Sequence, residues 1–127
     1  MDTGIESVTT AALQLALDAA SLRQQAIAAN IANADAQGYA PVRVSFEEQL
    51  DEVRRGLADG GSIDALALSA VRPHLVPAAA ADAAAEPVRL DVEAARLAEN
   101  GVRYQALVKG LSRHLGILEI AVADGRK

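Results

Sequence analysis

LDVEAARLAENGVRYQALVKGLSRHLGILEIAV, residues 90–122, is the stretch of sequence that decides the fold. Apolar or small residues recur in it at alternating steps of four and three positions: Leu90, Ala94, Leu97, Gly101, Tyr104, Val108, Leu111, Leu115, Leu118 and Val122. This rhythm keeps one stripe of an α-helix turned toward a neighbouring helix, as in coiled coils. We therefore predict one long helix over residues 88–123, with this row as the seam that packs against a second helix.

The predicted helix is too long for a compact domain of this size. At ~1.5 Å of rise per residue it extends on the order of 50 Å. Pro87 suits its start and Gly125 its end. Three glycines inside it weaken it by ~1 kcal/mol each: Gly101, Gly110 and Gly116. They are either accidental or positions where a second helix approaches closely, and we favour close packing.

A second helix is predicted over residues 7–34, which contain neither glycine nor proline. Its apolar residues form two offset rows rather than one. The first row is Val8, Ala12, Leu15, Ala19, Leu22, Ala26 and Ala29, and the second is Leu13, Leu17, Ala20, Ile27 and Ile31, interrupted by Gln24. Two rows require two neighbours. Because a two-helix hairpin covers only one row, the other is expected to pair with another chain.

The segment between these helices has no helical period and is rich in glycine, proline and alanine. Val42, Val44 and Phe46 alternate as in a strand. We predict an all-α fold in which long N- and C-terminal helices pair as an antiparallel coiled coil, joined by an irregular, partly mobile connector. The boundaries are 1–36 for the first helix, 37–87 for the turn and connector, and 88–127 for the last helix.

The core of this fold is expected to be thin. There is no tryptophan, one phenylalanine and two tyrosines, so burial depends on small aliphatic side chains. Tyr104 lies on the seam, where packing in the core is its expected role. A single molecule of this kind is expected to be marginally stable and to need partners.

Composition argues against several functions. The net charge is −5, from 12 basic and 17 acidic residues, and no basic cluster exceeds Arg54–Arg55, which argues against nucleic-acid binding. Cysteine is absent, and no uncharged apolar stretch is long enough for a membrane helix. The first residues lack the pattern of a secretory signal. We expect neither nucleic-acid partners nor direct membrane insertion.

No arrangement of residues suggests catalysis. His74 and His114 lie in different segments without a second ligand at metal spacing. The acidic pairs 47–48 and 51–52 resemble a solvated helix face. Ser112 and His114 point away from each other on a helix. We predict that the chain is not an enzyme and holds no cofactor or metal.

Short motifs in both helices resemble those of the flagellar rod and hook protein family. AANIANADAQGY (residues 28–39) is similar to the family's Asn-x-x-Asn-x-x-x-x-Gly-Tyr signature, apart from variations at Ala29, Ala36, Gln37 and Ala40. LDVE (90–93), LAEN (97–100) and RYQAL (103–107) are similar to its last helix. RPHL (72–75) and LSRHLG (111–116), with the short length, resemble its proximal-rod branch.

The resemblance implies a subunit of the basal-body rod, whose terminal helices form the inner layer of a hollow, torque-transmitting tube. It implies a place in the rod that spans the periplasm, reached through the type III export channel without a cleaved signal peptide. Implied partners are further copies, FliE, FlgC, FliF and the export apparatus. The residues expected to serve assembly are Asn30, Asn33, Gly38, Tyr39, Phe46, Leu97, Tyr104, Leu111, Leu115 and Leu118.

Four residues of this set have two interpretations: Asn30, Asn33, Tyr39 and Phe46. Asn30 and Asn33 either cap the helix end or bond to the backbone of a neighbouring subunit. Gly38 is expected to supply a positive φ. Tyr39 packs under the turn or anchors an interface, and Phe46 holds the connector onto the helices or onto the next subunit.

Two other classes of protein remain open. A helical adaptor or export chaperone that never polymerises shares the two seams but has no need of the Asn-x-x-Asn turn. A membrane-surface protein would carry a lysine-rich polar face with aromatic anchors, which this chain lacks.

Overall fold

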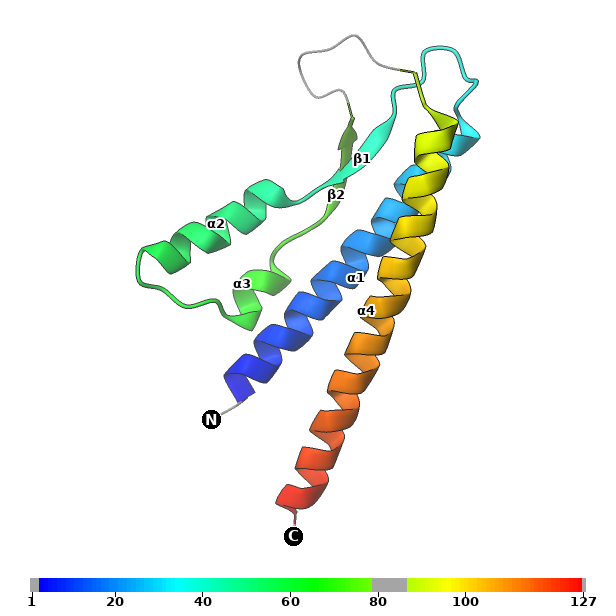
Figure 1. Ribbon diagram of the computed structural model, residues 1–127. Coiled ribbons are helices and arrows are strands. Elements are labelled where there is room, and N and C mark those ends of the chain that lie inside the picture. Colours follow the sequence, from blue (N-terminus) through cyan, green and yellow to red (C-terminus); the bar gives the residue numbers. More distant parts are fainter. Residues whose placement is uncertain (1–2, 79–86, 127) are drawn as a thin grey trace.

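The computed structural model describes residues 3–78 and 87–126, and its main feature is a pair of long helices (Figure 1). Helix α1 (Thr3–Ala32) runs along the molecule, and helix α4 (Leu90–Gly125) returns antiparallel to it. The predicted fold of two long, paired terminal helices is confirmed. The C-terminal end of α4 projects beyond the start of α1 (Figure 1).

The segment between the two helices contains four short elements. Strand β1 (Val42–Ser45) and strand β2 (His74–Pro77) pair antiparallel, with Val44 opposite Leu75. Between them lie helix α2 (Glu47–Ala58) and helix α3 (Ala65–Ser69). Asp64 caps α3, because its Oδ1 accepts from Ala67 N at 2.6 Å.

The expected strand-like alternation around Val44 is confirmed by β1, in which that side chain is buried. The other three elements lie where the sequence suggested an irregular connector. Helix α3 and strand β2 have only five and four residues, too few to show a period in the sequence. Helix α2 is longer and amphipathic, so its sequence carried a helical signal that the prediction of an irregular connector did not include. Most of the alanine run, at residues 79–86, lies outside the described residues.

Helix α1 is the central element, because it is covered on two sides by its own chain. It contacts α4, and it also contacts α3, β1 and β2. The buried apolar residues lie at these contacts: Ala19, Ala20, Ala26, Ile27, Val44, Leu68 and Val71. The row that α4 leaves uncovered was expected to pair with another chain, and this expectation is wrong for the free chain. Helix α3 and the strands β1 and β2 pack against that side of α1.

Only some residues of the seam predicted for α4 are buried. Leu97, Leu111 and Leu118 are partly buried, as expected. Tyr104 is 42% exposed and Leu115 is 48% exposed, so core packing of Tyr104 is wrong. Every second member of the predicted row from Ala94 onward, together with Leu90, is mostly exposed. We call them the outer row: Leu90, Ala94, Gly101, Val108, Leu115 and Val122.

A different row of α4 faces α1, and it is largely polar. The inner row consists of Glu93, Asn100, Leu107 and His114, each seven residues from the next. Asn100 Nδ2 donates to Ala20 O at 2.9 Å, and His114 Nε2 lies 3.1 Å from Thr10 Oγ1. These bonds join α1 and α4 at two levels along the column. Polar residues in such positions fix the register of two helices at some cost in stability.

The glycines of α4 do not mark a close approach of helices within the chain. A Cβ added at Gly101 or Gly116 would meet no atom within 4 Å, and one at Gly110 would meet only Leu13 Cδ2, at 3.9 Å. The close-packing interpretation is thus wrong for the contact between α1 and α4. Among the described helices, none combines the length and apolar character that a membrane crossing demands.

Candidate assembly interface

The Asn-x-x-Asn turn is built around one buried side chain, Asn30 at the end of α1. Its Oδ1 accepts from Val42 N and from the Tyr39 hydroxyl, both at 2.9 Å. Its Nδ2 donates to Val42 O at 2.9 Å and to Glu93 Oε2 at 3.4 Å. An asparagine amide offers two acceptor and two donor positions, so all four are used. Asn30, only 3% exposed, joins α1, β1 and α4 at one point.

The bonds that were expected across a subunit boundary are therefore made by Asn30 within its own chain. The amide pairs with both backbone groups of Val42, as a neighbouring strand would, and fixes where β1 begins. Glu93, which is 5% exposed, also accepts from Arg96 Nη1 at 2.9 Å. A buried carboxylate is costly unless it is paired in this way. Asn30 and its hydrogen-bonded partners Tyr39, Val42 and Glu93 form a node. This node connects the Asn-x-x-Asn turn to the first turn of α4.

Gly38 and Tyr39 complete this turn. Gly38 has φ +78°, which confirms the predicted positive value and suits a residue without a Cβ. Tyr39 N donates to Ala36 O at 3.2 Å, and its hydroxyl reaches back to Asn30. The structure thus shows the packing role for Tyr39, under the turn.

Asn33 differs from Asn30, because it is exposed. Its Nδ2 donates to Ala29 O at 2.8 Å, and its backbone N bonds to the same oxygen at 3.0 Å. It thus satisfies a carbonyl at the end of α1, which is a capping role. Its part in an interface between subunits remains a prediction.

We expect Asn33→Ala to lower the free energy of unfolding by less than about 1 kcal/mol, because its only side-chain bond is exposed. Circular dichroism and urea denaturation measure this change. If the variant keeps its helicity and stability but fails to enter the rod, Asn33 serves an interface. Normal assembly would assign it to capping alone.

Sequence reasoning missed Glu93, Asn100 and His114 as residues that face α1. All three are polar and were assigned to no seam, although they lie within the motifs similar to the family's last helix. The available signal was their spacing, since they occur at steps of seven together with Leu107. Phe46 precedes α2 and is partly buried, so its side chain belongs at least in part to the chain's own fold.

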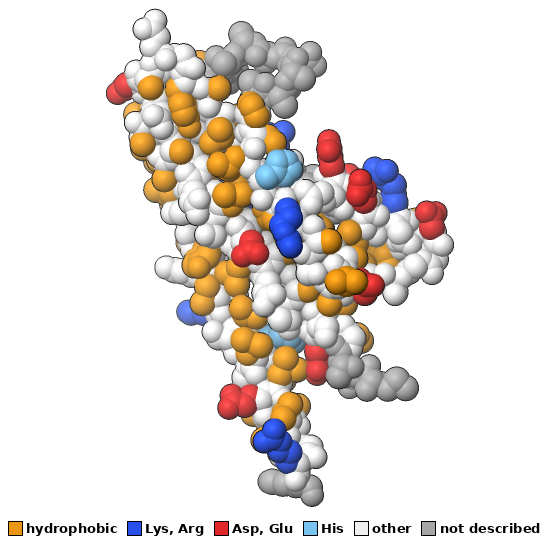
Figure 2. Space-filling model, turned by 180° about the vertical axis from the view of Figure 1, so that it is seen from behind, with side chains coloured by type: hydrophobic (Ala, Val, Ile, Leu, Met, Phe, Trp, Pro, Cys, Tyr) orange, Lys and Arg blue, Asp and Glu red, His pale blue; other side chains and the backbone are white. Residues whose placement is uncertain are grey.

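The outer row of α4 exposes several large apolar side chains. Leu90, Leu115 and Val122 are 52%, 48% and 57% exposed. Near the end of α4, Ile117 and Ile120 are exposed as well. Figure 2 shows hydrophobic side chains along the whole length of the helical column. Isolated exposed apolar residues need no explanation, whereas several along one helix are a candidate contact surface for a partner.

A second apolar surface lies near the start of α1. A hollow there is lined by residues of α1, of α3 and of the loop before α3, including Ile5, Val8, Ile63 and Leu66. Ile5 and Leu66 are 73% and 78% exposed. This hollow and the outer row are different in composition and in place. The chain therefore exposes two unlike apolar surfaces.

The described residues contain no group of three or more histidine, cysteine, aspartate or glutamate side chains that could hold a metal ion. His114 lies between α1 and α4 beside Thr10, and His74 lies on β2 with Nδ1 3.2 Å from Arg72 O. These contacts are structural.

The chain resembles proteins of known function over most of its length. It is 31% identical over 113 residues to the flagellar basal body rod protein FlgB of Escherichia coli (strain K12), covering 78% of this chain and 81% of that relative. It is 32% identical to FlgB of Salmonella typhimurium over 108 residues, covering 72% and 76%. It is 30% identical to FlgB of Bacillus subtilis over 122 residues, covering 90% and 92%.

No protein-family model matches the sequence. The family is instead shown by the pairwise similarities, which cover 72% to 90% of this chain. Each alignment covers more than two thirds of both proteins at 30% identity or above. This chain therefore belongs to the FlgB family of flagellar basal body rod proteins.

Proposed function

We propose that the chain is a rod subunit that polymerises through packing of its long helices and transmits torque along the assembly. The observation that carries this proposal is the outer row of α4. Its large apolar members are left exposed by the chain's own fold: Leu90, Val108, Leu115 and Val122. Burial of apolar surface is the main favourable term in association, at ~25 cal/mol per Å².

The two unlike apolar surfaces favour an open assembly over a closed dimer. A closed two-fold dimer uses the same patch on both partners, whereas contact between two different patches repeats from one subunit to the next. The outer row of α4 and the hollow near Ile5 and Leu66 provide such a pair of patches. A helical rod is the assembly that this kind of contact generates.

The proposed partners are further copies of the chain and other proteins of the rod and basal body. FliE, FlgC and FliF are the ones that the family resemblance implies. We propose that the subunit reaches this place through the flagellar export apparatus without a cleaved signal peptide. The thin core supports this route, because a marginally stable helical chain is readily unfolded for transport.

The proposal is tested by the place of the protein in the cell. We expect an epitope-tagged chain to co-purify with basal bodies of its source bacterium and to persist after membranes are dissolved with detergent. A cytoplasmic chaperone or adaptor would instead remain in the soluble fraction. Sedimentation of the purified chain provides the second measurement. A closed dimer that ignores every rod partner contradicts polymerisation.

A further inference from the structure

Asn100 is followed by Gly101, and this pair is the only Asn–Gly sequence in the chain. In such a pair the backbone nitrogen of the glycine can attack the side-chain Cγ of the asparagine, because the glycine has no Cβ to hinder its approach. Asparagine is one of the thermally labile residues of proteins. The other two asparagines, Asn30 and Asn33, each precede a residue with a Cβ, which slows the same attack. The sequence thus contains one site of fast deamidation, inside α4.

The reaction has two steps, and water is its only co-reactant. In the first step Gly101 N gives its proton to hydroxide and forms a bond to Cγ of Asn100. The bond from Cγ to Nδ2 breaks, and the nitrogen takes a proton from water and leaves as ammonia. In the second step water opens the resulting five-membered imide at one of its two carbonyl carbons. Aspartate or isoaspartate then replaces Asn100, and in isoaspartate the backbone runs through the side-chain carbon.

The backbone of α4 blocks the first step in the folded chain. Gly101 lies well inside the helix, where each N–H donates to the carbonyl four residues earlier. A nitrogen in this position keeps its proton and directs it along the helix axis, away from Cγ of Asn100. Closure of the imide ring also requires residue 100 to leave the helical ψ of about −42°. Helix α4 must therefore open around Gly101 before the attack is possible.

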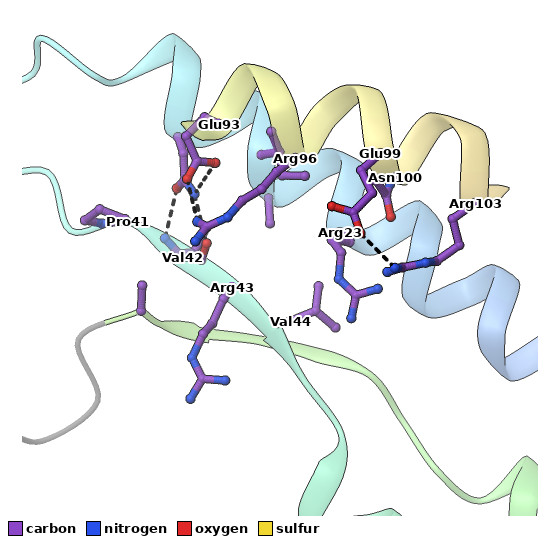
Figure 3. A pocket seen from close by; sticks show the side chains of 14 residues that line it. Arg23, Pro41, Val42, Arg43, Val44, Glu93, Arg96, Glu99, Asn100 and Arg103 are labelled. Carbon is purple, nitrogen blue, oxygen red and sulfur yellow. Dashed lines mark hydrogen bonds and ion pairs between the residues drawn. The ribbon is translucent and has the colours of Figure 1, made fainter. Parts of the chain in front are cut away.

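The surroundings of the Asn100 side chain oppose the charges that the reaction creates. Figure 3 shows Asn100 on α4, at the wall of the groove between α1, β1 and α4, with its side chain directed toward α1. The residue is 2% exposed, and no described residue donates to its buried Oδ1. Attack at Cγ moves negative charge to this oxygen, which needs a hydrogen-bond donor for stabilisation. The leaving Nδ2 needs a proton, yet its two partners are acceptors: Ala20 O at 2.9 Å and Gln24 Oε1 at 2.8 Å.

We propose that Asn100–Gly101 is a deamidation site that is closed while α1 and α4 are paired and open when the chain is unfolded. The folded chain reacts only through rare openings of α4, whereas the unfolded chain reacts as a free peptide does. The fraction of aspartate and isoaspartate at position 100 therefore measures the time that a chain has spent unfolded. This proposal concerns the free chain alone and does not depend on the rod function.

Both products of the reaction prevent α1 and α4 from pairing again. Aspartate at position 100 lacks the Nδ2 donor, so a carboxylate would lie beside Ala20 O and the Gln24 side chain in a buried position. A buried carboxylate without donors or a positive partner is strongly disfavoured. Isoaspartate adds one carbon to the backbone inside α4 and so interrupts the hydrogen bonds of the helix. A chain that deamidates while unfolded thus loses the ability to fold.

Peptide mapping by mass spectrometry measures the reaction at each asparagine of the full chain. Trypsin releases Asn100 in the peptide of residues 97–103. It releases Asn30 and Asn33 together in the peptide of residues 24–43, which serves as the internal control. The chain is incubated folded in buffer and unfolded in guanidinium chloride at the same mildly alkaline pH, and a synthetic 97–103 peptide in both solvents corrects for the denaturant. We expect deamidation at Asn100 to be at least about tenfold faster in the unfolded chain.

Two glycine variants of α4 separate the effect of the Asn–Gly pair from the stability of the helix. Gly101→Ala removes the pair, and its Cβ would meet no atom within 4 Å, so the fold is kept. In the unfolded chain this variant is expected to deamidate at residue 100 about tenfold more slowly, because the added Cβ hinders the attack. Gly116→Ala is the matched control, since its Cβ also meets no atom within 4 Å and it strengthens the same helix. When unfolded, it is expected to deamidate like the wild type.

Refolding tests the consequence of the reaction. After long incubation in denaturant, dilution is expected to restore the helical circular dichroism of Gly101→Ala but not of the wild type, whose loss should match the deamidated fraction. Asn100→Asp, made directly, is expected to lower the folding equilibrium constant by at least about tenfold.

Three results would overturn the proposal. The first is an equal rate at Asn100 in the folded and the unfolded chain. The second is an unfolded chain in which the peptide of residues 97–103 deamidates no faster than the peptide of residues 24–43. The third is a deamidated chain that refolds with the helical signal and thermal midpoint of the wild type, because residue 100 would then be of no consequence for the pairing of α1 and α4.

Discussion

Asn30→Ala is expected to lower the free energy of unfolding by about 4 kcal/mol. The change removes four hydrogen bonds at one point and leaves Val42 N, Val42 O and the Glu93 carboxylate short of partners. Each buried group without a partner costs about 1–3 kcal/mol. The losses share one network, so they sum to less than four independent bonds. Urea denaturation measures the change, and thermal unfolding should shift down by about 10 °C or more.

Asn33→Ala is the matched control, with the same substitution three residues later at an exposed position. The ratio of the losses in unfolding free energy of Asn30→Ala and Asn33→Ala is more informative than either loss alone. If both variants lose similar, small amounts of stability, Asn30 does not join the three elements in solution. The node would then have to form only on assembly.

Leu115→Asp is expected to keep the fold and to abolish rod assembly. Leu115 is 48% exposed in the free chain, so a carboxylate there remains hydrated and the free energy of unfolding changes by less than about 1 kcal/mol. In an assembled rod the same carboxylate would be buried in an apolar contact, at a cost of several kcal/mol. Association is therefore expected to weaken by about a hundredfold or more, with loss of motility.

Two other variants on the same helix show whether assembly fails because a subunit contact is lost or because the chain unfolds. Ser112→Asp adds the same charge at an exposed position off the outer row and is expected to assemble. Leu111→Asp places the charge on the partly buried side and is expected to unfold the chain and so to abolish assembly too. Normal swimming with Leu115→Asp would rule out the outer row as a subunit contact.

Much of the fold can be predicted from the spacing of hydrophobic residues, but the face of α4 that packs against α1 cannot. The predicted seam and the row that faces α1 share Leu97, Leu111 and Leu118. The two differ in their remaining residues. In the predicted seam these residues are those of the outer row, which are apolar. In the face that packs against α1 they are those of the inner row, which are mainly polar. Apolar residues were assigned to the inside because burial is favourable for a single chain. A chain that is completed by neighbours can place its polar set inside, where it fixes register, and keep the apolar set outside.

The node around Asn30 could not be predicted from the sequence for another reason. The motif pointed to Asn30, Gly38 and Tyr39, and the positive φ of Gly38 followed from residue type alone. The partners of Asn30, however, come from β1 and α4, residues 12 and 63 positions away in sequence. A short strand such as β1 gains its place only by contact with α1. Local patterns do not encode such distant contacts.

The central claim is that the free chain leaves the outer row of α4 bare and that other subunits cover it. Because the sequence contains no cysteine, Val108→Cys introduces a single reactive thiol in this row, and Arg113→Cys introduces an exposed one outside it. Labelling with a maleimide in the free subunit and in the purified rod measures the exposure of each. We predict that both thiols react in the free chain and that only Val108→Cys becomes protected in the rod. Equal labelling of both thiols in the assembled rod would contradict this account.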